Sequence, residues 1–444
     1  MKKFFNKYGV YIGIFIFTFC FYEFFNFKNA YGDPMNNYCF SYAIVRGEIP
    51  YLDFNTISTP FYAFIMSIGL LFFNNYIMFI LEQSLLITIM CYFLYSLYGK
   101  KSYLLLVGVS LFGFLAIEPT YNFMVLFFLT MLLFLEKKYS EKDYLIGFVM
   151  GLSFLSKHTI GILFFLFPMV RYYKDKRKLI RRFIGFLIPI AIFFVYLLLT
   201  GSLYAFIDLC FLGLFDFTGK NGNFFDFYTL ISLLCLILSI IITIKKKDDI
   251  SNYYLLASFS FVIPLFNFHH FSIYFLCLMI QILPLIKKWN QSYSVLSLLM
   301  AFLFSTIIVI NIYVYLKPTF CHEFEHFQYS LKGKHDYEAS LQNYKIFDQY
   351  DNPLIISSEK RLYDVSRNRD IDYYDAFFYG NFGYHGSKKM INNIKKMHNR
   401  YVILDRNDYN ADFDNQFDLE IANYIINNTK YVKKEGIFDI YYIE

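Results

Sequence analysis

The segment RYYKDKRKLIRRFIGFLIPIAIFFVYLLLT, residues 171–200, decides the fold class of this chain. Its first part, 171–182, is rich in Lys and Arg, and the part that follows, 183–200, carries no charge. An apolar helix of about 17–25 residues crosses the hydrocarbon core of a bilayer. The whole chain is 57% hydrophobic and only 17% charged, below the about 25% that is usual for soluble domains. These features predict a polytopic α-helical membrane protein.

Similar apolar runs recur along the chain and predict about 11 spans. Several of them are short, as expected of helices that end within the protein or are broken around a cavity. The predicted spans are 8–25, 76–98, 103–117, 120–135, 144–156, 158–170, 183–200, 228–244, 251–266, 271–286 and 292–316.

The distribution of basic residues predicts the orientation of these spans. With the N-terminus inside, the cytoplasmic segments hold 20 Lys and Arg, whereas the short outer segments hold four: Lys28, Arg46, Lys157 and Lys220. Lys and Arg in short loops are retained on the cytoplasmic side. We therefore expect a multi-pass protein of the cell (plasma or inner) membrane with a cytoplasmic N-terminus. The net charge of +6 is an orientation signal, and we expect no nucleic-acid partner.

Residues 317–444 are too polar for further spans and are predicted to lie outside the cytoplasm. NPLIISS, RYVILD and GIFDIYYIE have the Ile, Val and Tyr content and the turn boundaries of strands. SKKMINNIKKMHN and DLEIANYIINN have helical spacing. The predicted organisation is a membrane domain, 1–316, whose first outer loop is 26–75, followed by a small C-terminal extracytoplasmic α/β domain, 317–444.

In this topology, polar residues gather at outer turns that belong to separate hairpins. Carboxylates suit proton abstraction, and Lys, Arg and His suit phosphate binding. The seven cysteines show no metal-ligand spacing. Plain solvation, turn formation and helix capping are alternative roles that stay open for these polar residues. The residues concerned are Asp33, Arg46, Glu48 and Asp53 in the first outer loop, Glu118, Lys157 and His158 at the next turns, and His269 and His270 later.

Four motifs, in order along residues 1–290, resemble those of the GT-C superfamily of membrane glycosyltransferases, which includes protein O-mannosyltransferases and bacterial family 39 relatives. The first outer loop carries Asp33, Gly47, Pro50, Tyr51, Asp53, Phe54 and Pro60. The further motifs are EPTYNFMVLFFL from Glu118, GFVMGLSFLSKHTIGIL from Gly147, and IPLFNFHHFSIYFLC, in which His270 matches best. The sequence has GDP in place of an adjacent acidic pair, so a second carboxylate would come from Asp53 or Glu118.

The resemblance implies a GT-C-like fold, a polyprenyl-phosphate-linked sugar as donor, an extracytoplasmic acceptor and an inverting displacement. Asp33 is the expected general base, and Lys157, His270 and Arg46 are expected to stabilise charge on the leaving phosphate. Glu118 or Asp53 would orient the acceptor or a divalent cation, so the metal requirement stays open. The remaining residues expected to bind substrate are Tyr51, Tyr121, Asn122, His158 and His269.

Two other functions stay open. A transporter or flippase of lipid-linked saccharide would carry its charges at the membrane midplane, in two related halves. A noncatalytic scaffold that displays residues 317–444 would not depend on Asp33. The polar residues collect on one face and no halves are visible, which favours the transferase.

Overall fold

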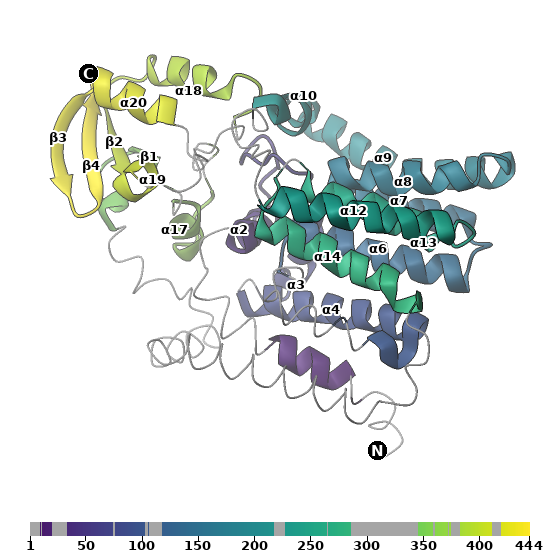
Figure 1. Ribbon diagram of the computed structural model, residues 1–444. Helices are drawn as coiled ribbons and strands as arrows, with labels where there is room; N and C mark the ends of the chain where they lie inside the picture. The colour runs from purple at the N-terminus through teal and green to yellow at the C-terminus, as the bar shows by residue number, and fades with distance from the viewer. Residues whose placement is uncertain are drawn as a thin grey trace. The chain divides into compact units, whose positions relative to one another are not determined.

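The computed structural model describes most of the chain (Figure 1). The predicted spans 103–117 and 292–316 lie outside the described residues, and so does the junction between the two predicted domains. The described residues are 9, 11–19, 33–73, 76–102, 105, 118–216, 227–263, 265–285, 345–357, 360–371, 373, 382–410 and 419–444.

The chain divides into two compact units. The first, which we call the helical unit, comprises Met1–Lys28, Ile80–Phe193 and Asn223–Gln328. The second, which we call the loop–sheet unit, comprises Asn29–Phe79, Phe194–Gly222 and Tyr329–Glu444. Residues of the predicted first outer loop therefore cluster with the C-terminal sheet.

Helices that agree with most of the predicted spans form the helical unit, and several lie side by side (Figure 1). α7 packs against both α6 and α8, and α13 packs against α8. The helices are α4 (Tyr76–Tyr98), η2 (Gly99–Ser102), α6 (Tyr121–Lys138), α7 (Asp143–Ser156), α8 (His158–Arg171), α9 (Lys176–Thr200), α12 (Phe227–Lys245), α13 (Ser251–Ala257), η5 (Ser258–Val262), α14 (Phe268–Ile282) and η6 (Leu283–Leu285).

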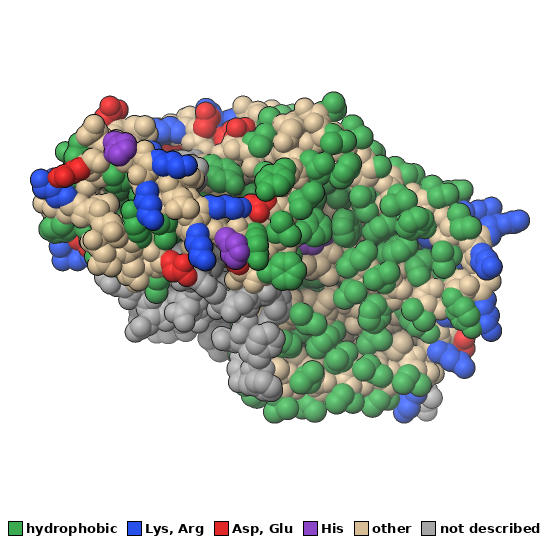
Figure 2. Space-filling view, turned by 90° about the horizontal axis from the view of Figure 1, so that it is seen from above, with side chains coloured by type: hydrophobic (Ala, Val, Ile, Leu, Met, Phe, Trp, Pro, Cys, Tyr) green, Lys and Arg blue, Asp and Glu red, His purple; other side chains and the backbone are tan. Residues whose placement is uncertain are grey.

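Four helices among the described residues are long and apolar enough to cross a membrane: Tyr76–Tyr98, Lys176–Thr200, Phe227–Lys245 and Phe268–Leu285. Figure 2 shows a broad apolar surface, and exposed apolar side chains on α9 and α12 contribute to such a surface.

Two predicted spans differ from the structure. α9 begins at Lys176, ahead of the predicted residue 183, because Asp175 accepts a hydrogen bond from the Lys178 backbone N–H (3.0 Å) and starts the helix among the basic residues. The predicted span 251–266 is instead α13 followed by the short η5.

Three close backbone contacts join α7 to α9. A methyl group at Gly147 would lie 2.0 Å from the carbonyl oxygen of Arg182, and one at Gly151 would lie 2.4 Å from that of Phe186. From the other side, a methyl group at Gly185 would lie 2.3 Å from the carbonyl oxygen of Tyr144. Only glycine allows helices to approach this closely. The spacing of Gly147 and Gly151 thus has a packing reason of its own.

The loop–sheet unit contains a four-stranded sheet in the order β1-β2-β4-β3. β1 (Leu354–Ile356) is parallel to β2 (Arg400–Asp405), β2 is antiparallel to β4 (Phe438–Ile443), and β3 (Lys430–Glu435) is antiparallel to β4. The three predicted strands are confirmed. β3 was not predicted, because its exposed sequence KYVKKE has the polarity of a loop. The helices of this unit are α2 (Asp33–Val45), α3 (Phe61–Leu70), α10 (Leu203–Ile207), η4 (Asp208–Leu212), α17 (Lys360–Ser366), α18 (Gly386–Ile394), α19 (Arg406–Asn410) and α20 (Leu419–Asn428).

Side-chain contacts explain why the first outer loop belongs to the loop–sheet unit. Arg361 of α17 is buried and donates to Asn55 Oδ1 (3.1 Å) and to Asn36 Oδ1 (3.3 Å). Its guanidinium also lies 4.4 Å from the centre of the Phe40 ring. These contacts hold α2 and the following loop against α17.

Candidate functional site

Lys157 occupies the turn between α7 and α8. A methyl group at Gly161 would lie 2.3 Å from Phe154 Cα, so the two helices pack closely just beyond the turn. The backbone of Lys157 is extended (φ −155°, ψ 103°), which breaks the helix there and places this side chain at the start of α8.

The amine of Lys157 reaches the first turn of α6. It donates a hydrogen bond to Asn122 Oδ1 (2.9 Å) and lies 5.2 Å from the centre of the Tyr121 ring. Asn122 is fully buried, and its Nδ2 has no hydrogen-bond acceptor among the described residues. A buried amide donor without an acceptor is costly. The amide would therefore gain from an oxygen supplied by a ligand.

A carboxylate and two histidines lie at the same helix starts. Glu118 Oε2, just before α6, is 3.6 Å from His269 Nδ1 in the first turn of α14. The His269 and His270 rings are 5.2 Å apart at their centres. Asn267 caps α14 by accepting from the His270 backbone N–H (3.0 Å), and the same oxygen lies 2.8 Å from His270 Nδ1. These contacts fix the orientation of the His270 ring.

The two groups meet at the start of α6, because Glu118, which contacts His269, and Asn122, which accepts from Lys157, are only four residues apart there. We call Glu118, Tyr121, Asn122, Lys157, His269 and His270 the Lys157 cluster. It gathers at the N-terminal ends of α6, α8 and α14, where backbone N–H groups and the helix dipoles favour an anion. Six of the eleven residues expected from the sequence are therefore brought together. His158 also begins α8, but it is buried and its ring faces Phe154 (6.4 Å between centres).

The other four expected residues belong to the loop–sheet unit. Asp33 is the first residue of α2, with an exposed side chain. Arg46 pairs with Asp370 (2.7 Å). Asp53 accepts a hydrogen bond from the Ile49 backbone N–H (2.6 Å), and the buried Tyr51 donates to the Ser58 carbonyl oxygen (3.0 Å). Asp53 and Tyr51 thus have structural contacts of their own within this loop.

Glu48 lies between Arg46 and Asp53 in the same loop. Its Oε1 accepts from the Ile371 backbone N–H (3.4 Å), whereas Oε2 is buried without a hydrogen-bond partner among the described residues. Burial raises the pKa of Glu48 to about 7, because a carboxylate loses hydration when it is covered.

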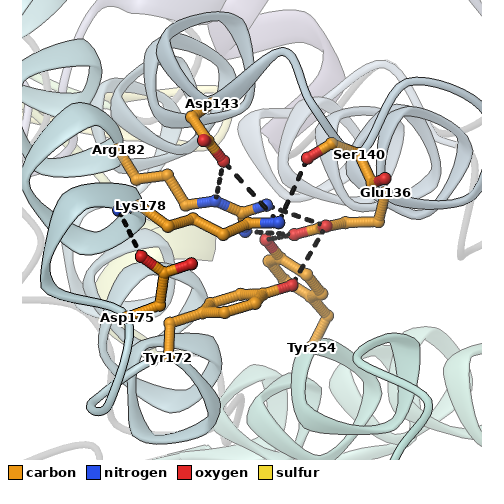
Figure 3. Close-up of polar contacts among 8 residues, drawn as sticks. All are labelled: Glu136, Ser140, Asp143, Tyr172, Asp175, Lys178, Arg182 and Tyr254. Atoms are coloured by element: carbon orange, nitrogen blue, oxygen red, sulfur yellow. Dashed lines mark hydrogen bonds and ion pairs between the residues drawn. The ribbon is translucent and has the colours of Figure 1, made fainter.

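A buried ionic network at the opposite helix ends was not predicted (Figure 3). All three guanidinium nitrogens of Arg182 donate: Nε to Asp143 (3.0 Å), and Nη1 and Nη2 to the two oxygens of Glu136 (2.5 and 3.0 Å). Tyr254 also donates to Glu136 (2.7 Å). The Arg182 and Glu136 side chains are both 0% exposed.

Lys178 extends this network. Its amine donates to the Ser140 carbonyl oxygen (3.1 Å) and lies 3.8 Å from Asp143 Oδ1. Two cations therefore face two carboxylates, and we call Glu136, Asp143, Lys178, Arg182 and Tyr254 the Arg182 network. The RYYKDKRKLIRR run predicted only a cytoplasmic loop. To distinguish the buried Arg182 from the exposed Arg181, the prediction would have needed to know which face of the helix packs inward.

Among the described residues, no group of three His, Cys, Asp or Glu side chains is arranged to hold a metal ion. No family model, curated protein or solved structure matches this chain. The family resemblance of the sequence motifs thus stays a prediction.

Proposed function

We propose that the chain is an integral membrane glycosyltransferase of the GT-C type. It moves a sugar from a polyprenyl-phosphate donor to an extracytoplasmic acceptor, with inversion at the anomeric carbon. About 11 spans cross the cell membrane, with the N-terminus in the cytoplasm. The four long apolar helices support the membrane location, and the order of the sequence motifs supports the family.

The Lys157 cluster is the observation that carries this proposal. A lysine, two histidines and a buried amide converge from three helix starts. Cations, N–H donors and helix N-termini together form a site for a phosphate. A polyprenyl donor presents its phosphate at the membrane surface, which suits a site at the ends of apolar helices.

In the proposed transfer, the family resemblance gives the role of general base to Asp33 and the contacts with the leaving phosphate to the Lys157 cluster. Asp33 removes the proton of the acceptor hydroxyl, and the resulting oxygen attacks the anomeric carbon. The bond between that carbon and the phosphate oxygen breaks, and the phosphate leaves with the electron pair. Lys157, His270 and the Asn122 amide stabilise the charge on the leaving group. Glu118 orients His269, and we derive no step through a metal ion.

Asp33→Asn tests the chemistry. Removing a general base costs about 10²–10⁴-fold in rate, and an exposed side chain at the first residue of α2 contributes little to stability. We expect the variant to be inserted and folded like the parent, with nearly complete loss of transfer. The readout is envelope glycan analysis of a deletion strain complemented with parent or variant, together with release of polyprenyl phosphate in membranes.

Asp351→Asn is the control, because Asp351 is an exposed carboxylate of the loop–sheet unit that has no assigned role in the transfer. Transfer at the parental rate by Asp33→Asn would remove Asp33 from the mechanism. If the envelope glycans are the same in the deletion strain and in the strains complemented with parent or variant, the result would favour the noncatalytic scaffold.

A further inference from the structure

The first half of α9 has two different faces. Arg182, Gly185, Phe186 and Pro189 are buried, and Gly185 contacts the α7 backbone. The opposite face is exposed along its length: Lys176 and Arg177 come first, then Ile180 and Arg181, and then the apolar side chains Phe183, Ile184, Leu187 and Ile188.

The basic side chains of the exposed face form no ion pairs with the part of the chain that the structure describes. No ion pair between described residues involves Lys176, Arg177 or Arg181, whereas Arg182 and Lys178, on the same helix, are held in the Arg182 network. We call Lys176, Arg177 and Arg181 the α9 basic patch. Figure 2 shows Lys and Arg side chains gathered at one edge of the apolar surface.

We infer that the α9 basic patch binds the headgroups of anionic phospholipids. The basic residues lie directly before the exposed apolar side chains on the same helix face. A soluble anion would need only the charges, whereas a phospholipid uses both features, because its acyl chains cover the apolar face while its phosphate meets the basic side chains. Lys245, Lys246 and Lys247 at the end of α12 are also exposed. The Arg171–Asp248 ion pair (3.3 Å) joins the end of α8, just before α9, to the residues after α12, so these lysines and the α9 basic patch lie at the same end of the helical unit.

The inference rests on the membrane insertion that is part of the proposed function, but not on sugar transfer. Each Lys or Arg near an anionic surface contributes about a fivefold preference. Loss of three such residues should therefore lower the preference more than about tenfold.

The test uses the full chain, purified in a neutral detergent and mixed with equal amounts of phosphatidylglycerol and phosphatidylcholine of identical acyl chains. Native mass spectrometry counts the lipids that stay bound. The parent should retain phosphatidylglycerol preferentially, and Lys176→Gln/Arg177→Gln/Arg181→Gln should retain both lipids equally. Lys176→Arg/Arg177→Lys/Arg181→Lys should behave like the parent, because it keeps the charges.

A matched control removes three exposed lysines from α18 and its end, in Lys388→Gln/Lys395→Gln/Lys396→Gln, and should keep the preference. An equal loss in this control would show that net charge alone acts, and would overturn the inference. No preference in the parent, or an unchanged preference in the α9 variant, would also overturn it. If the α9 variant does not fold, the parent decides alone: its preference should vanish between about 0.05 M and about 0.5 M salt, and a preference that persists would contradict the proposed headgroup contact.

Discussion

The two ends of the helical unit use ionisable residues in opposite ways. In the Arg182 network, every guanidinium nitrogen has a partner, the two cations face two carboxylates, and Arg182 and Glu136 are fully buried. In the Lys157 cluster, the lysine donates to a neutral amide, His269 and Glu118 are partly exposed, and the buried Asn122 Nδ2 has no acceptor among the described residues. A network that is complete by itself stabilises a fold. A cluster that leaves a buried donor unused is suited to a ligand.

The largest expected effect comes from breaking the complete network. Arg182→Met leaves Glu136 and Asp143 buried without this cation, and breaking a buried ion pair costs about 3–5 kcal/mol. We expect a large fall in the melting temperature of the detergent-solubilised protein. Arg181→Met, the adjacent but exposed residue, should change stability by about 0.5 kcal/mol or less. Equal melting temperatures for the two variants would remove the distinction.

The incomplete cluster should respond in activity instead. Lys157→Met removes a cation from the proposed phosphate site, and loss of one such stabilising donor lowers the rate by about 10²–10³-fold. The structural contacts that are lost include the hydrogen bond to Asn122 and the contact with the Tyr121 ring, at about 1 kcal/mol each. Release of polyprenyl phosphate and melting temperature should therefore separate. Lys142→Met, an exposed lysine before α7, is the control, and a parallel loss of folded protein and activity in Lys157→Met would favour a structural role.

A pair of buried tyrosines sharpens the comparison at smaller scale. Tyr254 donates to Glu136, so Tyr254→Phe should cost about 1–2 kcal/mol of unfolding free energy. The Tyr274 hydroxyl is buried without a hydrogen-bond partner among the described residues, so Tyr274→Phe should be neutral or slightly stabilising. Thermal unfolding of both variants measures the difference, and a larger cost at Tyr274 would show that its hydroxyl has a partner.

The smallest expected effect depends on pH and lies in the loop–sheet unit. The pKa of Glu48 is raised to about 7, so the folded state binds more protons than the unfolded state between about pH 4.5 and 7. Stability should therefore fall as the pH rises through this window and level off above it. Glu48→Gln removes the titrating group. The free energy of unfolding of this variant, measured relative to that of the parent, should therefore increase by about 1 kcal/mol from about pH 4.5 to 7.5, with a matching rise in its relative melting temperature. A difference that does not change with pH would contradict this assignment.

Local sequence signals predicted much of the fold and of the Lys157 cluster. Apolar runs gave α4 and α7 almost to the residue, and polar residues at turns gave Glu118, Lys157 and His269. Pairings distant in sequence left no such signal. Arg46 and Asp370 pair across more than 300 residues, and Arg182 is buried while Arg181 is exposed. Composition cannot separate two adjacent arginines, because their environments depend on which face of α9 meets α7.

The glycine contacts between α7 and α9 bear on how this protein tolerates mutation. Gly147, Gly151 and Gly185 each lack room for one methyl group beside a backbone carbonyl. In a saturation mutagenesis experiment, these positions should reject even alanine, whereas the exposed Ile184 next to Gly185 should accept any apolar residue. The map of tolerated substitutions would thus trace the line along which the two helices touch, without any structural measurement.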